Sequence, residues 1–107
     1  MTEFNWTAEE LQEIVDGNRL VLFMKGTPEQ PQCGFSARAA MVYQQLEIPF
    51  VSVNILADSR AIPAVCEWSD WPTMPQCYID GELIGGSDIV FEMFESGELL
   101  EMISEGK

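Results

Sequence analysis

The spacing of hydrophobic residues near the start of the chain predicts a helix followed by a strand. Thr7 and Glu10 have the spacing of a capping box, in which each side chain accepts a hydrogen bond from the other residue's backbone N–H. The apolar stripe that follows stops at Gly17, so we expect a helix up to that residue. Residues 20–25 (LVLFMK) are almost continuously apolar, which is typical of a parallel strand buried on both faces.

A proline-containing break, GTPEQPQ, separates this strand from a second predicted helix. Residues 33–46 are rich in alanine and predict a helix, while residues 50–56 (FVSVNIL) alternate as a strand does. A helix between two strands predicts that those strands run parallel. We expect the helix to pack through Phe35, Ala39, Met41, Val42 and Leu46.

The next part of the chain predicts a third helix and a hairpin. Residues 58–70 are helix-like but contain Pro63, and a proline in a helix interior costs about 3 kcal/mol or more. We therefore expect the regular helix to begin near Pro63. Residues 76–79 and 82–84 flank Asp80-Gly81, which is a strong signal for a type I′ hairpin.

Residues 88–104 predict one or two further helices, broken near Gly97. The resulting order, α-β-α-β-α-β-β-α, combines a parallel pair of strands with an antiparallel hairpin. It predicts an α/β fold with a mixed four-stranded sheet and helices on both faces. A chain of 107 residues suits one domain, which we expect to span 1–107 with a core over about 7–104.

The charge of the chain narrows its possible partners. Eighteen acidic residues against five basic ones give a formal net charge of -13, which repels nucleic acid and anionic lipid. A basic protein partner fits better, although solubility or a salt-adapted host would also explain the charge. There is no apolar run near the ~18 residues of a membrane span and no secretory leader pattern. We expect no nucleic-acid or membrane partner and a cytoplasmic location, with a mature organellar form as the alternative.

Three cysteines and no histidine restrict the chemistry. Sparse cysteines fit a reducing compartment, and no Cys-His nucleophile pair can form. Cys33 begins a helix, where free N–H groups and the helix dipole lower a thiol pKa, so we expect a functional thiol there. Lys25 should lie at the same sheet edge, either binding an anion or simply solvated. We expect Cys77 in the core, and Cys66 is open between a structural and a functional role.

Three separated motifs resemble those of CGFS-type monothiol glutaredoxins. They are KGTPEQPQCGFS at 25–36, WPTMPQ at 71–76 and GELIGGSDI at 81–89. The resemblance spans about residues 7–104 and implies the thioredoxin fold, in agreement with the predicted element order. It also implies binding of glutathione and a 2Fe-2S cluster, a part in iron-sulfur assembly and iron homeostasis, and BolA-like partners.

The resemblance implies roles for four residues around the first two motifs. Cys33 is similar to the family's cluster ligand and reactive thiol. Lys25 resembles the lysine that contacts the glycine carboxylate of glutathione. Pro75 resembles the family's cis-proline, which leaves the backbone of Met74 free to pair with the tripeptide like a short strand.

In the third motif, Ser87 and Asp88 resemble the pair that holds the γ-glutamyl end of glutathione. Helix-start N–H groups suit its carboxylate, and the Asp88 carboxylate suits its ammonium. Many family members have a cysteine at the position of Ser87, so a disulfide from Cys33 to that position is impossible here. Phe35 and Trp71 match scaffold positions, and we expect both as core aromatics.

Ile62 is a departure from the family pattern, because the family usually has a glutathione-binding arginine there. Arg60 is two residues away, about 200° around a helix, so it cannot simply substitute. An unwound segment at Pro63 would change that geometry. The departure predicts a weakened glutathione site.

A single cysteine in the motif permits no disulfide within the motif, but it supplies one thiolate. A 2Fe-2S cluster usually needs four sulfur ligands, which two copies of Cys33 and two glutathione thiols could provide. We therefore expect a cluster-bridged homodimer, or a complex with a BolA-like protein, that carries clusters to apo iron-sulfur acceptors. The alternatives are a glutathione-dependent thiol-disulfide oxidoreductase for deglutathionylation, at most a weak enzyme, and an interaction module with a weakened glutathione site.

Overall fold

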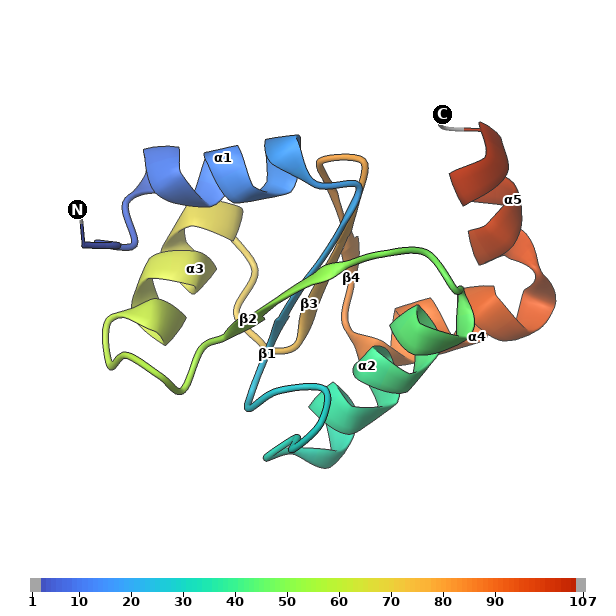
Figure 1. The fold of residues 1–107 in the computed structure, drawn as a ribbon, viewed down its shortest axis with the longest axis horizontal. Coiled ribbons are helices and arrows are strands. Elements are labelled where there is room, and N and C mark those ends of the chain that lie inside the picture. The colour runs from blue at the N-terminus through green and yellow to red at the C-terminus, as the bar shows by residue number, and fades with distance from the viewer. Residues whose placement is uncertain (1–2, 106–107) are drawn as a thin grey trace.

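The computed structural model describes residues 3–105 and has a four-stranded mixed sheet at its centre (Figure 1). Its strands are β1 (Leu20–Met24), β2 (Val51–Asn54), β3 (Gln76–Ile79) and β4 (Glu82–Gly85). They lie in the order β2-β1-β3-β4. β1 runs parallel to β2 and antiparallel to β3, and β3 and β4 form an antiparallel hairpin. The predicted mixed sheet is confirmed.

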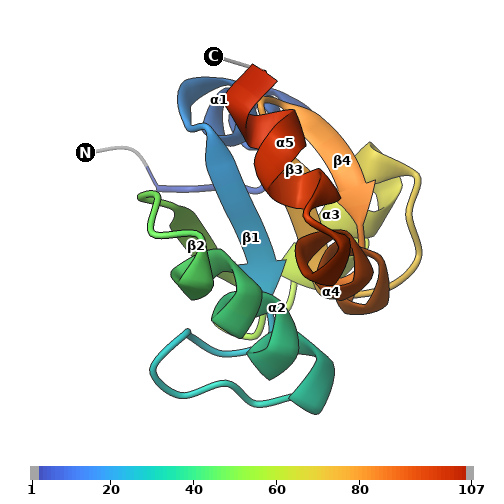
Figure 2. The ribbon, with the colours of Figure 1, turned by 90° about the vertical axis from the view of Figure 1, so that its right-hand side faces the viewer.

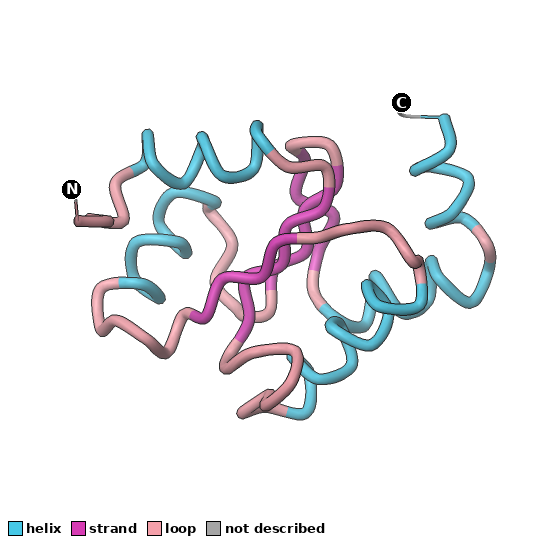
Figure 3. Tube along the Cα trace, in the orientation of Figure 1, coloured by secondary structure: helices cyan, strands magenta, loops and turns pink. Residues whose placement is uncertain are grey.

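Helices cover both faces of this sheet (Figures 1 and 2). α1 (Ala8–Gly17) and α3 (Ala61–Ser69) lie on one face, and α2 (Gly34–Gln45) and α4 (Ser87–Ser96) lie on the other. α5 (Glu98–Glu105) follows α4 and packs into the same layer. The strands therefore cross the middle of the molecule between two helical layers, as Figure 3 shows.

The side chains of β1 divide the interior into two cores. Leu20, Leu22 and Met24 face the core under α2 and α4. Val21 and Phe23 face the core under α1 and α3. Because alternate residues of a strand point to opposite faces, a central strand covered on both sides has to be apolar throughout. This is the origin of the continuous run LVLFM.

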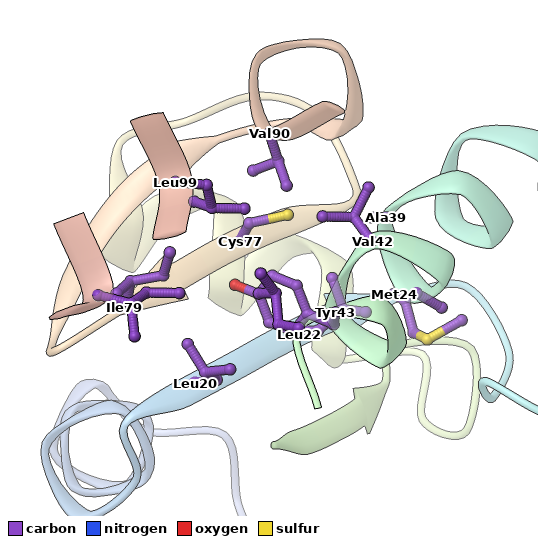
Figure 4. Packing of buried hydrophobic residues seen from close by; sticks show 13 residues of the cluster. Leu20, Leu22, Met24, Ala39, Val42, Tyr43, Cys77, Ile79, Val90 and Leu99 are labelled. Atoms are coloured by element: carbon purple, nitrogen blue, oxygen red, sulfur yellow. The ribbon is translucent and has the colours of Figure 1, made fainter. Parts of the chain in front are cut away.

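Cys77 lies inside the larger core, as predicted. Figure 4 shows it among Ala39, Val90 and Leu99, and its side chain is fully buried. The nearby hydroxyl of Tyr43 donates a hydrogen bond to the Tyr78 carbonyl (2.9 Å), with the Val21 carbonyl also in reach (3.3 Å), so this buried polar group is satisfied.

Three local signals in the sequence are confirmed. The Thr7–Glu10 capping box is formed in both directions at the start of α1. Asp80 and Gly81 both have positive φ angles, 52° and 83°, as a type I′ turn requires. Gly97 is left-handed and separates α4 from α5.

The predicted packing face of α2 is right in part. Ala39, Val42 and Leu46 are buried, at spacings of three and four residues. Met41 and Phe35 are exposed, so these two assignments are wrong. Met41 lies off the buried stripe because a helix presents one side to a sheet, and Phe35 belongs to the first turn of α2, at the rim of the site described below.

Two predicted boundaries also shift. α3 begins at Ala61, so Pro63 is its third residue, where the missing N–H would have had no partner within the helix. β2 ends at Asn54, because the Asn54 side chain accepts a hydrogen bond from the Leu56 N–H (2.9 Å) and turns the chain. Within residues 3–105, no helix is long and apolar enough to cross a membrane.

Candidate functional site

The loop between β1 and α2 brings Cys33 to the end of β1. The N–H of Gln32 donates a hydrogen bond to the carbonyl of Lys25 (2.9 Å), which closes the loop. The N–H of Lys25 donates to the Ser36 hydroxyl (3.0 Å), which ties the strand end to the first turn of α2. Lys25 and Cys33 therefore share one edge of the sheet, as expected.

Gly26 makes this loop possible. Its φ angle is +92°, and a Cβ placed there would lie 2.5 Å from the Gln30 carbonyl oxygen. Its N–H donates to the side-chain oxygen of Asn54 (3.0 Å), which connects the loop to the end of β2. Only glycine accommodates both the left-handed backbone and the close approach of the returning chain.

Cys33 is the N-cap residue of α2 and is partly exposed. Its surroundings lower its pKa from the ordinary value of 9.0. The backbone N–H of Ser36 is the largest cause, partial burial opposes it, and the Phe35 N–H and the charge of Lys25 add smaller contributions. The thiol form makes no capping hydrogen bond, so these donors are available to the thiolate. The position favours a nucleophilic or metal-binding sulfur.

The other two cysteines lie elsewhere. Burial raises the pKa of Cys77 to about 12, so this thiol stays protonated and inert. Cys66 lies on α3, one turn after Ile62, and is partly buried. Its role stays open.

A hollow of about 400 Å³ lies between the first turn of α2, the 71–75 loop and the first turn of α4. Four of its walls, Met74, Pro75, Ser87 and Asp88, are residues that the family resemblance places at the glutathione site, and the Met74–Pro75 peptide bond is cis. Cys33 is not one of its walls, but the wall residue Phe35 is two residues further along α2. The walls are Phe35, Trp71, Thr73, Met74, Pro75, Gly86, Ser87, Asp88 and Ile89.

A second hollow, of about 260 Å³, continues from the first. Its walls are Lys25, Ile62, Pro72, Thr73 and Met74. Since Thr73 and Met74 belong to both hollows, the two meet along the 71–75 loop. We call them together the groove. Lys25 stands at one end of the groove, and the start of α4 forms the other end.

Arg60 is turned away from the groove. Its guanidinium donates hydrogen bonds to Asp58 (2.7 Å), to the Phe4 carbonyl (3.2 Å) and to the side-chain oxygen of Asn5 (3.3 Å). The same guanidinium holds the pKa of the Asp58 carboxyl well below its usual range. Arg60 therefore anchors the N-terminal segment, and Ile62 leaves its end of the groove with the single cation Lys25 among the wall residues.

The start of α4 forms the polar end of the groove. Gly86 is the N-cap, Ser87 is buried and the Asp88 side chain is 76% exposed. The first N–H groups of a helix have no partners within it and favour a carboxylate. Asp88 also faces a cation, since Nη1 of Arg38 lies 3.8 Å from its Oδ1.

The structure corrects the expectation that Phe35 and Trp71 are core aromatics. Phe35 is 60% exposed and Trp71 is only partly buried, and both are walls of the groove. Thr73, which joins the two hollows, was not predicted as a site residue, although it lies within the motif WPTMPQ. Arg38 was not predicted as a site residue either. The one indication in the sequence was its position about one helical turn after Phe35.

A thiol with a lowered pKa at a helix start, beside a cis-proline loop on a mixed sheet, defines a thioredoxin-fold thiol protein. Comparison with known proteins is more specific. The glutaredoxin family model matches residues 20–84. The chain is 52% identical over 85 residues to "Probable monothiol glutaredoxin GrlA" of Legionella pneumophila, covering 79% of this chain and 96% of that one. It is 43% identical over 97 residues to "Uncharacterized monothiol glutaredoxin ycf64-like" of Synechocystis, covering 91% of each.

Solved structures agree with this result. Reduced apo GrxS14 of poplar has a TM-score of 0.78 and 46% identity, over 92% of this chain and 90% of that one. A glutaredoxin–glutathione complex of buckwheat has a TM-score of 0.78 and 28% identity, over 92% and 88% of the two chains. The chain belongs to the CGFS-type monothiol glutaredoxins and has their thioredoxin fold.

Proposed function

We propose that this glutaredoxin binds glutathione and a 2Fe-2S cluster shared between two subunits, and that it carries clusters to apo iron-sulfur proteins. The observation that carries the proposal is Cys33 at the start of α2: its thiol is partly exposed, its pKa is lowered, and it lies two residues before Phe35, a wall of the groove. Such a thiol can give one ligand to a cluster but cannot form a disulfide within its own motif.

The groove has the chemistry that glutathione needs. Lys25 offers an ammonium group for the glycine carboxylate at one end. The backbone of Met74, before the cis-proline, can pair with an extended peptide. At the other end, helix-start N–H groups at Ser87 suit the γ-glutamyl carboxylate and Asp88 suits its ammonium. The similarity to the buckwheat glutaredoxin–glutathione complex supports this assignment.

The residues of one chain fit a shared cluster. Within the described residues, no group of three or more His, Cys, Asp or Glu side chains is close enough to hold a metal ion. In a shared cluster, Cys33 of each of two copies and two glutathione thiols would make four sulfur ligands. Bound in this way, the cluster would supply transferable iron and sulfide.

The proposal extends to partners and location. We assign a homodimer formed through the cluster, a BolA-like protein as an alternative partner, and the cytoplasm as the compartment. Among partners other than a second copy of this chain, the net charge of -13 favours proteins with basic surfaces.

Anaerobic reconstitution with iron, sulfide and glutathione tests the proposal. We expect a coloured dimer with one 2Fe-2S cluster per two chains, formed only when glutathione is present. Cys33→Ser should lose the visible absorbance, while Cys66→Ser, the matched control, and Cys77→Ser should keep it. A Cys33→Ser protein that still binds the cluster would show that the ligand assignment is wrong.

The lowered pKa of Cys33 also supports a second candidate, a glutathione-dependent oxidoreductase. The Cys33 thiolate would attack the glutathione sulfur of a mixed disulfide, so that the old S–S bond breaks and the other sulfur leaves as a thiolate. A second glutathione thiolate would then attack the Cys33–glutathione disulfide, releasing glutathione disulfide and free Cys33.

A glutathione-coupled reductase assay separates the candidates. We expect weak turnover of small glutathione mixed disulfides, as the family resemblance implies. Turnover comparable to that of dithiol glutaredoxins would favour the enzyme. Neither turnover nor cluster binding would leave an interaction module with a weakened groove.

A further inference from the structure

The basic residues of this acidic chain are distributed unevenly. Arg60 is held by Asp58 and the N-terminal segment, and Arg19 donates hydrogen bonds to Asp80 and to the Ile103 carbonyl. Within residues 3–105, the charged groups of Lys25 and Arg38 donate no hydrogen bond. Lys25 is a wall of the groove, and Arg38 lies beside its other end. These two cations, whose charged groups donate no hydrogen bond within the described residues, therefore stand at opposite ends of the groove.

Arg38 contacts two residues of α4, and neither contact occupies its N–H donors. Its guanidinium carbon lies over the Phe91 ring on α4, 4.8 Å from the ring centre, which is within the range of a cation–π contact. Its Nη1 is 3.8 Å from Asp88 Oδ1, too far for a hydrogen bond. The side chain is 49% exposed, which leaves its N–H groups open to a ligand.

We infer that Arg38 is a second carboxylate-binding residue of the groove and acts at the γ-glutamyl end of glutathione; this inference rests on the proposed function. Glutathione carries one carboxylate at each end, and beside the γ-glutamyl carboxylate it has an ammonium group. The neighbouring charges of Arg38 and Asp88 are complementary to that pair. Arg38 takes the carboxylate, Asp88 takes the ammonium, and Lys25 takes the glycine carboxylate.

In this arrangement the groove binds the γ-glutamyl end of glutathione through more charged groups than the glycine end. Ile62 contributes no charge at the glycine end, so that end relies on Lys25. The other end combines the helix start with Arg38, whose planar fork of donors suits a carboxylate. A glutathione analogue without the γ-glutamyl carboxylate should therefore bind more weakly, because its contact with Arg38 is lost.

Calorimetry at low salt tests the inference with two ligands, glutathione and its analogue in which the γ-glutamyl α-carboxylate is a carboxamide. Arg38→Gln should weaken glutathione binding roughly two- to fivefold, as for a partly exposed ion pair. The matched control is Gln44→Glu, an exposed position on α2 about 9 Å further along the helix, which lowers the net charge by the same unit. Its affinity should stay within about 1.5-fold of the original.

The carboxamide ligand separates direct contact from a structural effect. Wild type and Arg38→Gln should bind it equally, whereas Arg38→Lys should recover part of the glutathione affinity. The inference fails if Arg38→Gln matches Gln44→Glu, or if its penalty persists with the carboxamide. If wild type binds no glutathione at all, the proposed function fails and the inference fails with it.

Discussion

The reactivity of Cys33 depends on where its sulfur lies relative to a few backbone N–H groups. The Ser36 N–H lowers its pKa most, and Lys25 contributes less than the N–H groups of the first helical turn. Alkylation by iodoacetamide should therefore show a midpoint pH below 9.0, since the rate follows the thiolate fraction. Lys25→Gln should move the midpoint upward by only a part of the total shift.

Mass spectrometry of the alkylated protein gives the internal control. Cys77, with a pKa of about 12 and full burial, should stay unmodified over the same pH range until the protein unfolds. A midpoint for Cys33 at or above 9.0 would contradict the electrostatic account of this site.

Ile62 is a wall of the groove at the same end as Lys25. Ile62→Arg should place a guanidinium beside Lys25 and tighten glutathione binding, because a charge-assisted hydrogen bond to a carboxylate contributes about 1.5 kcal/mol at its lower limit, or roughly tenfold. Cluster loss should slow in parallel. Calorimetry and the decay of visible absorbance measure the two effects.

Arg60→Ala is the control for this prediction. Arg60 is hydrogen-bonded to Asp58 and Phe4 and is not a wall of the groove, so its removal should leave glutathione affinity unchanged. An unchanged Ile62→Arg together with a large loss in Arg60→Ala would show instead that Arg60 already serves the glycine carboxylate.

At the scale of elements, the loop between β1 and α2 depends on Gly26. Gly26→Ala should lower the free energy of unfolding by at least about 1 kcal/mol, because alanine disfavours a φ of +92° and its Cβ would lie 2.5 Å from the Gln30 oxygen. Thermal or denaturant unfolding measures the loss.

Gly34→Ala is the matched control, on the other side of Cys33. An added Cβ at Gly34 meets nothing within 4 Å, and alanine is the better helix former, so stability should be unchanged or slightly raised. Equal effects of the two substitutions would mean that the loop is not held by its returning chain.

At the scale of the whole molecule, the net charge of -13 acts across a body of only 39 × 29 × 25 Å. The screening length is about 30 Å in 0.01 M salt and about 3 Å in 1 M salt, so the acids repel one another throughout the molecule only in dilute salt. The melting temperature should rise with sodium chloride concentration, as followed by circular dichroism.

Neutralising a single acidic residue tests whether repulsion among the acids causes this salt dependence. Glu95→Gln, at an exposed position in the last turn of α4, should stabilise the fold in dilute salt and lose this advantage in concentrated salt. A melting temperature that falls with salt would show that attractive pairs outweigh the repulsion.

Much of the fold follows from local signals. The continuous run 20–24, the capping box at Thr7 and the turn at Asp80-Gly81 act over a few residues, and each has one physically favoured structure. Boundaries were less predictable. Pro63 looks like a helix start in sequence but is tolerated as the third residue of α3, because the first turn has N–H groups without partners.

The amino-acid sequence by itself determined the element order, the lone helix-start thiol and the family. The tertiary structure decided what depends on segments far apart in the chain. Lys25, Ile62 and Met74 meet in one hollow only because the end of β1, the start of α3 and the loop before β3 lie at the same edge of the sheet. The exposure of Phe35, the hydrogen bonds of Arg60 to the N-terminal segment and the position of Arg38 over the Phe91 ring likewise depend on how the elements are placed relative to one another. Local periodicity carries no information about such contacts, because they depend on where each element ends relative to the others.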